Sequence, residues 1–426
     1  MSVAMRKYLP VGDLRDFTQL LHAAYMPFTL EKTATANIYF TVKRLRDVVA
    51  LLLNISHTLK QISSKQIKGI AMSLATDPRK NKLRRKTKRP VLDSLTNPAS
   101  DASLQPQPQL VSETEHVRGK KELDQYDNTL SSLRMQRIVM TITVVVPFLG
   151  LLTGIALAWQ YGMMNAWYLG MMLGGWVLTG LGITIGYHRM LTHRSFETVP
   201  IIHAFWTLMG ALAIEGSPLV WVAVHRKHHQ HSDLAEDPHS PHNHDGGYVN
   251  WWKGFYHAHM GWLFGKAWSE RTLQQYVPDL MPQRFTVFLD KYYLWVIVAT
   301  LAIPTAIAGL VTMSWTGAML GLIWGGLARM LMTHHVTWSI NSICHLFGSR
   351  DFQSGDDSRN NLLFGILGHG EGWHNNHHAF PTSARHGLKW WQFDLSWIII
   401  RSMEMCGLAW NVKLPSAKAM QAKRMP

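Results

Sequence analysis

Eight histidines in three tight clusters are the residues of this chain best suited to chemistry. The clusters read HRMLTH at 188–193, HRKHH at 225–229 and HNNHH at 374–378. Histidines within a cluster are adjacent or four or five residues apart, so a helical turn directs them to a common centre. Neutral imidazole binds iron, copper and zinc, so eight of them together predict more than one metal ion. Any one of them alone would be read as an ordinary surface or core residue.

Four apolar segments are long enough to cross a bilayer and must position these clusters. They are residues 138–159, 166–187, 292–313 and 315–332. Only the last contains a charged residue, Arg329, near its end, where we expect the long side chain to reach the interface. The pattern predicts an all-α membrane protein with four transmembrane helices.

Basic residues predict how these helices are oriented. The links at 161–165 and around Ser314 carry no Lys or Arg, whereas the N-terminal, middle and C-terminal segments are basic. By the positive-inside rule, both termini and the metal site are cytoplasmic. All three clusters then lie on one side, in a cytoplasmic helical cap. The apolar stretch 201–214 is too short to span and is expected at the interface, and the aromatic-rich stretch 248–268 is expected at headgroup level.

We divide the chain into a basic extension (1–130), an integral-membrane domain (131–415) and a tail (416–426). Of 42 Lys and Arg residues, 23 lie in the first 137 residues with 12 acidic residues, so +11 of the net +15 is there. The run 79–89 predicts a membrane-facing polybasic stretch rather than a nucleic-acid site, because no aromatic residues are interleaved.

Other features of the extension and the cysteines complete this organisation. Residues 41–62 have the spacing of an amphipathic helix, and 91–109 have the composition of a linker. No cleavable signal peptide is visible. The two cysteines, Cys344 and Cys406, form no disulfide framework and indicate a reducing compartment.

Four motifs occur in a family-specific order: HRMLTH, HRKHHQHSDLAEDPHSP, NSICH and GEGWHNNHHAFP. In this order they resemble the membrane-bound acyl desaturases of the delta-9, stearoyl-type group, over about 138–415. The downstream TSARHGLKWWQFDLSWIIIR is most similar to the bacterial and cyanobacterial branch. The resemblance implies an oxidoreductase of a bacterial plasma membrane. It would introduce a cis double bond, at the delta-9 position, into a saturated acyl chain with dioxygen and two electrons.

The resemblance also implies a non-haem diiron centre with two iron ions. Nine histidines match the family's ligand positions, and Asn341 matches a residue that reaches a metal through water. The histidines are His188, His193, His225, His228, His229, His345, His374, His377 and His378.

We expect the remaining histidines near these motifs to have other roles. His203 is assigned to packing, His334 and His335 to a structural role, and His386 to a surface loop. His369 stands where an apolar residue is expected. The others, assigned to loops or to the aromatic belt, are His231, His239, His242, His244, His257 and His259.

An acyl chain requires an apolar tunnel between the helices. Trp176 and Met172 lie 12 and 16 residues before His188, at about 18 and 24 Å along a helix, a depth that suits the methyl end of the chain. Animal relatives have an Arg-Asp pair before the second cluster that helps to hold CoA, whereas this chain has Ala223 and Val224. The acyl carrier, CoA or a membrane lipid, therefore stays open.

Two other functions use similar residues. Diiron hydroxylases of alkyl or lipid substrates share the histidine clusters, and a membrane metal carrier would also need ligands, although carriers place them within the spans. No haem-binding HPGG segment occurs, and two cysteines cannot ligate an iron–sulfur cluster. We therefore expect a separate ferredoxin or b-type cytochrome with its reductase to supply electrons.

Overall fold

The computed structural model describes residues 130–242, 248–265 and 270–426. Four features predicted above lie outside these residues: the basic run 79–89, the amphipathic segment 41–62, the linker 91–109 and His244. The predicted extension thus lies outside them too, except for its last residue, Leu130, where the first described helix begins.

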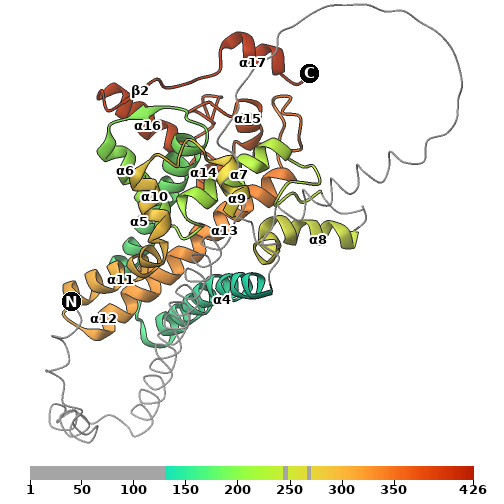
Figure 1. Cartoon of the computed structure of the whole chain (residues 1–426). Helices are drawn as coiled ribbons and strands as arrows, with labels where there is room; N and C mark the ends of the chain where they lie inside the picture. Colours follow the sequence, from blue (N-terminus) through green and yellow to red (C-terminus); the bar gives the residue numbers. More distant parts are fainter. Residues whose placement is uncertain (1–129, 243–247, 266–269) are drawn as a thin grey trace, which may run out of the picture. The chain divides into compact units, whose positions relative to one another are not determined.

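Three long helices form one end of the described part of the chain (Figure 1). Helix α4 spans Leu130–Tyr161, α5 spans Ala166–Leu181 and continues as the π-helical segment η2 (Gly182–Thr192), and α11 spans Tyr293–Thr312. Stretches of 30, 27 and 20 residues in these helices are long and apolar enough to cross a membrane. They coincide with three of the four predicted spans.

The fourth predicted span is divided into shorter helical segments. Helix α12 (Trp315–Leu320), the π-helical η4 (Gly321–Ala328) and α13 (Arg329–Ser342) follow one another without a break. The expectation that Arg329 reaches the interface is wrong, because its side chain is only 2% exposed. Its guanidinium donates to the hydroxyls of Thr179 and Thr300 and to two carbonyl oxygens, so its donors are satisfied inside the protein.

Short elements gather at the other end of the described part (Figure 1). Before α11 these are α6 (Pro200–Ala211), α7 (Pro218–His231), α8 (Tyr248–His259), η3 (Gly261–Phe264), α9 (Glu270–Tyr276) and α10 (Arg284–Lys291). After α13 they are η5 (Ile343–His345), α14 (Leu362–Leu367), α15 (His374–Ala379), α16 (Leu395–Met405) and α17 (Ala417–Lys423). Strands β1 (Glu197–Thr198) and β2 (Ala409–Trp410) pair antiparallel.

Close contact between η2 and α6 fixes the segment that carries the first histidine cluster. A Cβ atom at Gly182 would lie 2.2 Å from the backbone N of Gly210, and one at Gly186 would lie 2.4 Å from the carbonyl oxygen of Trp206. Only glycine permits the two backbones to approach this closely. Ile185 and Tyr187 on η2 are fully buried. The first cluster therefore stands on a rigid, closely packed segment.

Candidate metal centre

The π-helical segment η2 explains the five-residue spacing of the first cluster. A π-helix pairs residue i with residue i+5, and the His193 N–H donates to the His188 carbonyl at 3.1 Å. The two imidazoles therefore lie on the same face, with ring centroids 4.8 Å apart. The second and third clusters lie on α7 and α15, where four-residue spacing serves the same purpose.

All nine histidines predicted as ligands lie in one of two groups. In each group, one ligand atom per residue lies within 4.8 Å of all the others. The five-histidine group comprises His188, His193, His225, His229 and His377, and the four-histidine group comprises His228, His345, His374 and His378. The Nε2 atoms of neighbouring imidazoles lie 2.9–3.4 Å apart, so these nitrogens converge.

Aspartates orient three imidazoles of the four-histidine group. Nδ1 of His228 lies 3.0 Å from Asp237, Nδ1 of His345 lies 3.0 Å from Asp233, and Nδ1 of His378 lies 2.5 Å from Asp356. An Nδ1–H that donates to a carboxylate leaves Nε2 with its lone pair directed at the centre, the arrangement of histidines that bind metals. Asp237 follows the second cluster in the sequence and therefore orients a histidine of that cluster.

Glu371 supports the five-histidine group. Its carboxylate lies 2.6 Å from Nδ1 of His188, 3.3 Å from Arg189 and 3.3 Å from Nδ1 of His386. The expectation that His386 lies on a surface loop is wrong, because its side chain is 1% exposed. The side chain of His386 is buried because it contacts the buried charged groups of Glu371 and Arg189.

Burial and mutual repulsion keep most of these imidazoles neutral. Burial, followed by the neighbouring histidines, lowers the pKa of His193, His225, His229, His374 and His377 well below the usual value. Burial also lowers the pKa of His378 to about 4, against the opposing effect of Asp356. A neutral imidazole is the form that binds a metal ion.

The carboxylates around the groups stay ionised. Burial alone would raise the pKa values of Asp233, Asp237, Asp356 and Glu371, but the hydrogen bonds and charges of their histidine partners hold these values well below the usual range. At His345 burial lowers the pKa, but Asp233 outweighs it and raises the value. Neutral nitrogen ligands surrounded by fixed negative charge fit dications.

One ligand atom is left without a hydrogen bond. The buried Nε2 of His193 has no partner among the described residues. A buried nitrogen of this kind costs free energy unless a ligand occupies its lone pair. This observation, together with the convergent Nε2 atoms, shows that the residues present fit metal ions.

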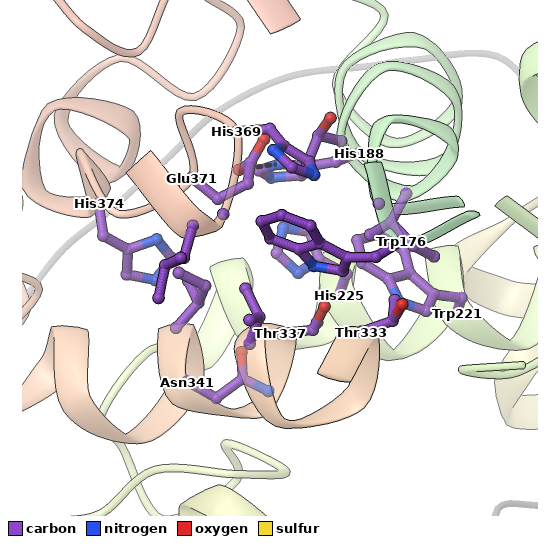
Figure 2. Close-up of a pocket in the computed structure, with 17 residues that line it drawn as sticks. Trp176, His188, Trp221, His225, Thr333, Thr337, Asn341, His369, Glu371 and His374 are labelled. Atoms are coloured by element: carbon purple, nitrogen blue, oxygen red, sulfur yellow. Dashed lines mark ion pairs between the residues drawn. The ribbon is translucent and has the colours of Figure 1, made fainter. Parts of the chain in front are cut away.

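Two cavities border these histidines, and Figure 2 shows the residues that line the smaller one. A cavity of about 50 Å³ is bordered by His188, His225 and His374. A larger one of about 350 Å³ is bordered by α4, η3 and α11. Both are lined by Trp221, His225, Thr337 and Asn341.

The two predicted tunnel residues lie in different places. Trp176 lines the smaller cavity, and Figure 2 shows its indole among the histidines. Met172 is not among the lining residues and packs instead in the apolar cluster around Tyr168 and Trp324. Asn341 borders the space next to the histidines, where a water ligand would have to lie.

Histidines not predicted as ligands occupy several environments. His334 Nε2 pairs with the Ala213 carbonyl oxygen at 3.0 Å, and His335 pairs with His259 at 3.0 Å, so these lie outside both groups. His239 instead packs 4.3 Å from His228, beside Asp237. His369 is buried and borders the smaller cavity.

Comparisons with known proteins agree with this geometry. The family model described as fatty acid desaturase matches residues 167–405. A hex-5-enoyl-[acyl-carrier protein] acetylenase of Moorena producens is 41% identical over 66% of this chain and 87% of its own. An sn-1 stearoyl-lipid 9-desaturase of Anabaena variabilis is 40% identical over 57% and 82%. An icosanoyl-CoA 5-desaturase of Limnanthes douglasii is 38% identical over 62% and 70%.

Proposed function

Because the chain belongs to the fatty acid desaturase family, we propose that it introduces a cis double bond between carbons 9 and 10 of a saturated acyl chain. The observation that carries this proposal is the position of two convergent imidazole groups beside a largely apolar cavity. The stearoyl-lipid 9-desaturase relative supports the bond position. Other relatives act at other positions, so the bond position needs a direct measurement.

We assign one iron ion to each histidine group, with Asn341 reaching a metal through water. When bound there, two irons would supply the oxidant that an unactivated methylene requires, from dioxygen and two electrons. The overall reaction converts –CH₂–CH₂–, O₂, two protons and two electrons into –CH=CH– and two molecules of water. One C–H bond is broken at each of the two carbons of the acyl chain, and both oxygen atoms of dioxygen leave as water.

The protein's own residues orient and enclose the reactants. Asp233, Asp237, Asp356 and Glu371 hold the imidazoles with Nε2 inward. The smaller cavity is lined by histidines of both groups, His188 and His225 from one and His374 from the other, and His225 also lines the larger cavity. We infer that the carboxyl half of the chain occupies the larger cavity, that carbons 9 and 10 lie near His225, and that the methyl half enters the smaller cavity.

A membrane lipid fits as the acyl carrier. Ala223 and Val224 are buried and apolar where animal relatives have the Arg-Asp pair. Arg226 is held by Asp279 and by carbonyl oxygens, and Lys227 is 1% exposed, so neither side chain is placed to hold an anionic CoA group. The larger cavity is bordered by Gln136, Val139, Met140 and Thr143 of α4, a helix apolar enough to face lipid.

We retain four membrane spans, with the run 315–342 as the fourth. This run is continuous, and η4 packs against α4, α5 and α11. In this arrangement the histidine-bearing elements lie together at one end, which we assign to the cytoplasmic side of a bacterial plasma membrane. A separate ferredoxin or b-type cytochrome would deliver electrons there.

The deciding experiment is expression in a desaturase-deficient host, followed by mass spectrometry of the fatty acids and of intact lipids. A new cis double bond between carbons 9 and 10 that appears first in intact lipids supports the full proposal. First appearance in acyl-CoA would reassign the carrier. A hydroxylated product would favour a hydroxylase over a desaturase. Bound iron without turnover would favour a metal carrier.

A further inference from the structure

The turn after α14 carries a histidine where helices normally end in glycine. The Gly370 N–H donates to the Gly365 carbonyl at 2.9 Å, and the His369 N–H donates to the Ile366 carbonyl at 3.2 Å. This is the Schellman pattern, whose left-handed residue is usually glycine because a Cβ atom is disfavoured there. His369 takes this position with φ of +54°. A disfavoured backbone conformation at a cavity points to a use for the side chain.

The His369 imidazole lies between two residues of α5 in the smaller cavity. Its side chain is 3% exposed, and Nε2 has no hydrogen-bond partner among the described residues. Its ring lies 4.9 Å from the Trp176 ring at an angle of 48°. A Cβ atom at Gly180 would lie 2.7 Å from the His369 Nε2, so glycine at 180 makes room for the imidazole.

Trp176 and His369 therefore lie in contact in the part of the smaller cavity that the larger cavity does not share. Trp176, Gly180 and His369 line the smaller cavity, whereas none of them lines the larger one. The residues shared by both cavities include His225 of the five-histidine group. A chain that enters from the larger cavity and passes His225 would reach the part of the smaller cavity that the Trp176–His369 pair lines.

We propose that His369 is a specificity-determining residue that holds the Trp176 indole in place as the end wall of the acyl cavity and thereby limits chain length. The proposal rests on the acyl desaturase function given above. A buried nitrogen without a partner at this end also disfavours extra methylenes, because they would cover it without a hydrogen bond. His369 contributes to the choice of substrate, whereas the reacting carbons lie near His225.

The test compares His369→Gly and His369→Asn with the wild type. Both residues tolerate the left-handed conformation, so the helix cap is kept while the imidazole is removed. The ratio of 18-carbon to 16-carbon products should rise about tenfold, since methylenes in an apolar pocket discriminate strongly. The matched control is His203→Asn, on α6 and outside both cavities, which should leave the ratio unchanged.

Coupling to Trp176 and a binding measurement complete the test. If His369 acts through the indole, adding His369→Gly to Trp176→Ala should change the ratio little beyond Trp176→Ala alone. Without a reductant, methyl palmitate should stabilise the wild-type protein against unfolding more than methyl stearate does. This difference should shrink in the His369 variants, and it reports binding independently of turnover. An unchanged ratio and unchanged stabilisation in both His369 variants would overturn the proposal. A wild-type protein that binds both esters but forms no alkene would instead contradict the proposed function.

Discussion

The two histidine groups are supported in different ways. In the four-histidine group, His228, His345 and His378 each have their own aspartate at Nδ1. In the five-histidine group, one carboxylate among the described residues, that of Glu371, lies within ion-pair distance of an imidazole of the group. Glu371 also pairs with Arg189 and His386. The four-histidine group therefore has more carboxylate charge around it, and the five-histidine group has one more imidazole.

Their positions relative to the cavities suggest a reason for this difference. His188 and His225 of the five-histidine group border the smaller cavity, whereas the four-histidine group contributes His374 alone. Of the four orienting carboxylates, Glu371 alone borders this cavity, where it is paired with Arg189. Further carboxylates beside an apolar chain would be costly to desolvate, so an additional neutral imidazole suits the side that faces substrate. The aspartates gather around the group that faces it less. We expect the two groups to retain metal unequally.

Removing one ligand from each group should have the largest effect. His228→Ala leaves three imidazoles in the four-histidine group, and His377→Ala leaves four in the other. Both should abolish desaturation while the protein still inserts, and His228→Ala should lose more iron because its group has fewer ligands. Iron per protein and alkene formation are measured in purified membranes. Near-wild-type activity in either variant would show that the residue is not a ligand.

Weakening the carboxylate partners should have the next largest effect. Asp237→Asn and Glu371→Gln should each lower metal affinity by about 10- to 100-fold, as expected for groups that orient metal-binding histidines. Iron retention during titration with a chelator measures this. Glu404→Gln is the control, because Glu404 pairs with Arg401 on α16 and belongs to neither histidine group. Equal retention in Asp237→Asn and in this control would mean that the aspartates do not support the site.

The sequence indicated which histidines gather better than it indicated their carboxylate partners, and the reason is separation along the chain. Histidines four or five residues apart report local helical geometry, and His345 was assigned through the family resemblance. Asp356 and Glu371 were missed, because Asp356 is 22 residues from His378, and Glu371 meets a histidine of a different helix. The spacing of five in HRMLTH was the available signal for a π-helix.

Hydropathy likewise predicted the local features of the fold and missed those that depend on distant contacts. It located three long apolar helices, because apolar length alone determines whether a helix can span a bilayer. It could not show that the π-helical η4 would divide the fourth segment or that Arg329 would be satisfied by hydroxyls and carbonyls of other helices. These features depend on contacts between distant residues.

Trp176→Ala examines the cavity beside the five-histidine group. If the indole blocks the end, the wild type should prefer acyl chains of about 16 carbons over 18, since overpacking costs roughly 1–3 kcal/mol. The variant should then shift toward 18 carbons. Product ratios for both chain lengths in both proteins measure the shift. Met172→Ala is the control, because Met172 lies outside the cavity lining. An unchanged ratio would mean that Trp176 is not the end of the tunnel.

Glu215→Gln should change stability with pH more than it changes catalysis. Glu215 borders the larger cavity and accepts from Trp221, whose ring stacks 4.9 Å from His225. Burial raises the pKa of Glu215 to about 7. The folded state therefore disfavours the ionised carboxylate. The contribution of protonated Glu215 to the free energy of unfolding is complete below the pKa of the unfolded state and is lost as pH rises through 7.

Between pH 5 and 8 the wild type should lose about 2–3 kcal/mol relative to Glu215→Gln. Thermal unfolding of both proteins across this range measures the difference. Glu236→Gln, at a carboxylate with 64% side-chain exposure, should give no such divergence. Parallel pH profiles for Glu215→Gln and the wild type would place the Glu215 charge in solvent.

Removing residues 1–128 should have the smallest effect of all. Both histidine groups, their carboxylate partners, both cavities and the candidate spans lie within residues 130–426. If the contrast between the two groups determines catalysis, the truncated protein should keep its iron content and most of its desaturation. Activity is compared at equal amounts of inserted protein, with an excess of electron donor. Normal iron content with lost activity would assign the extension to donor docking, because such a result leaves the metal groups intact.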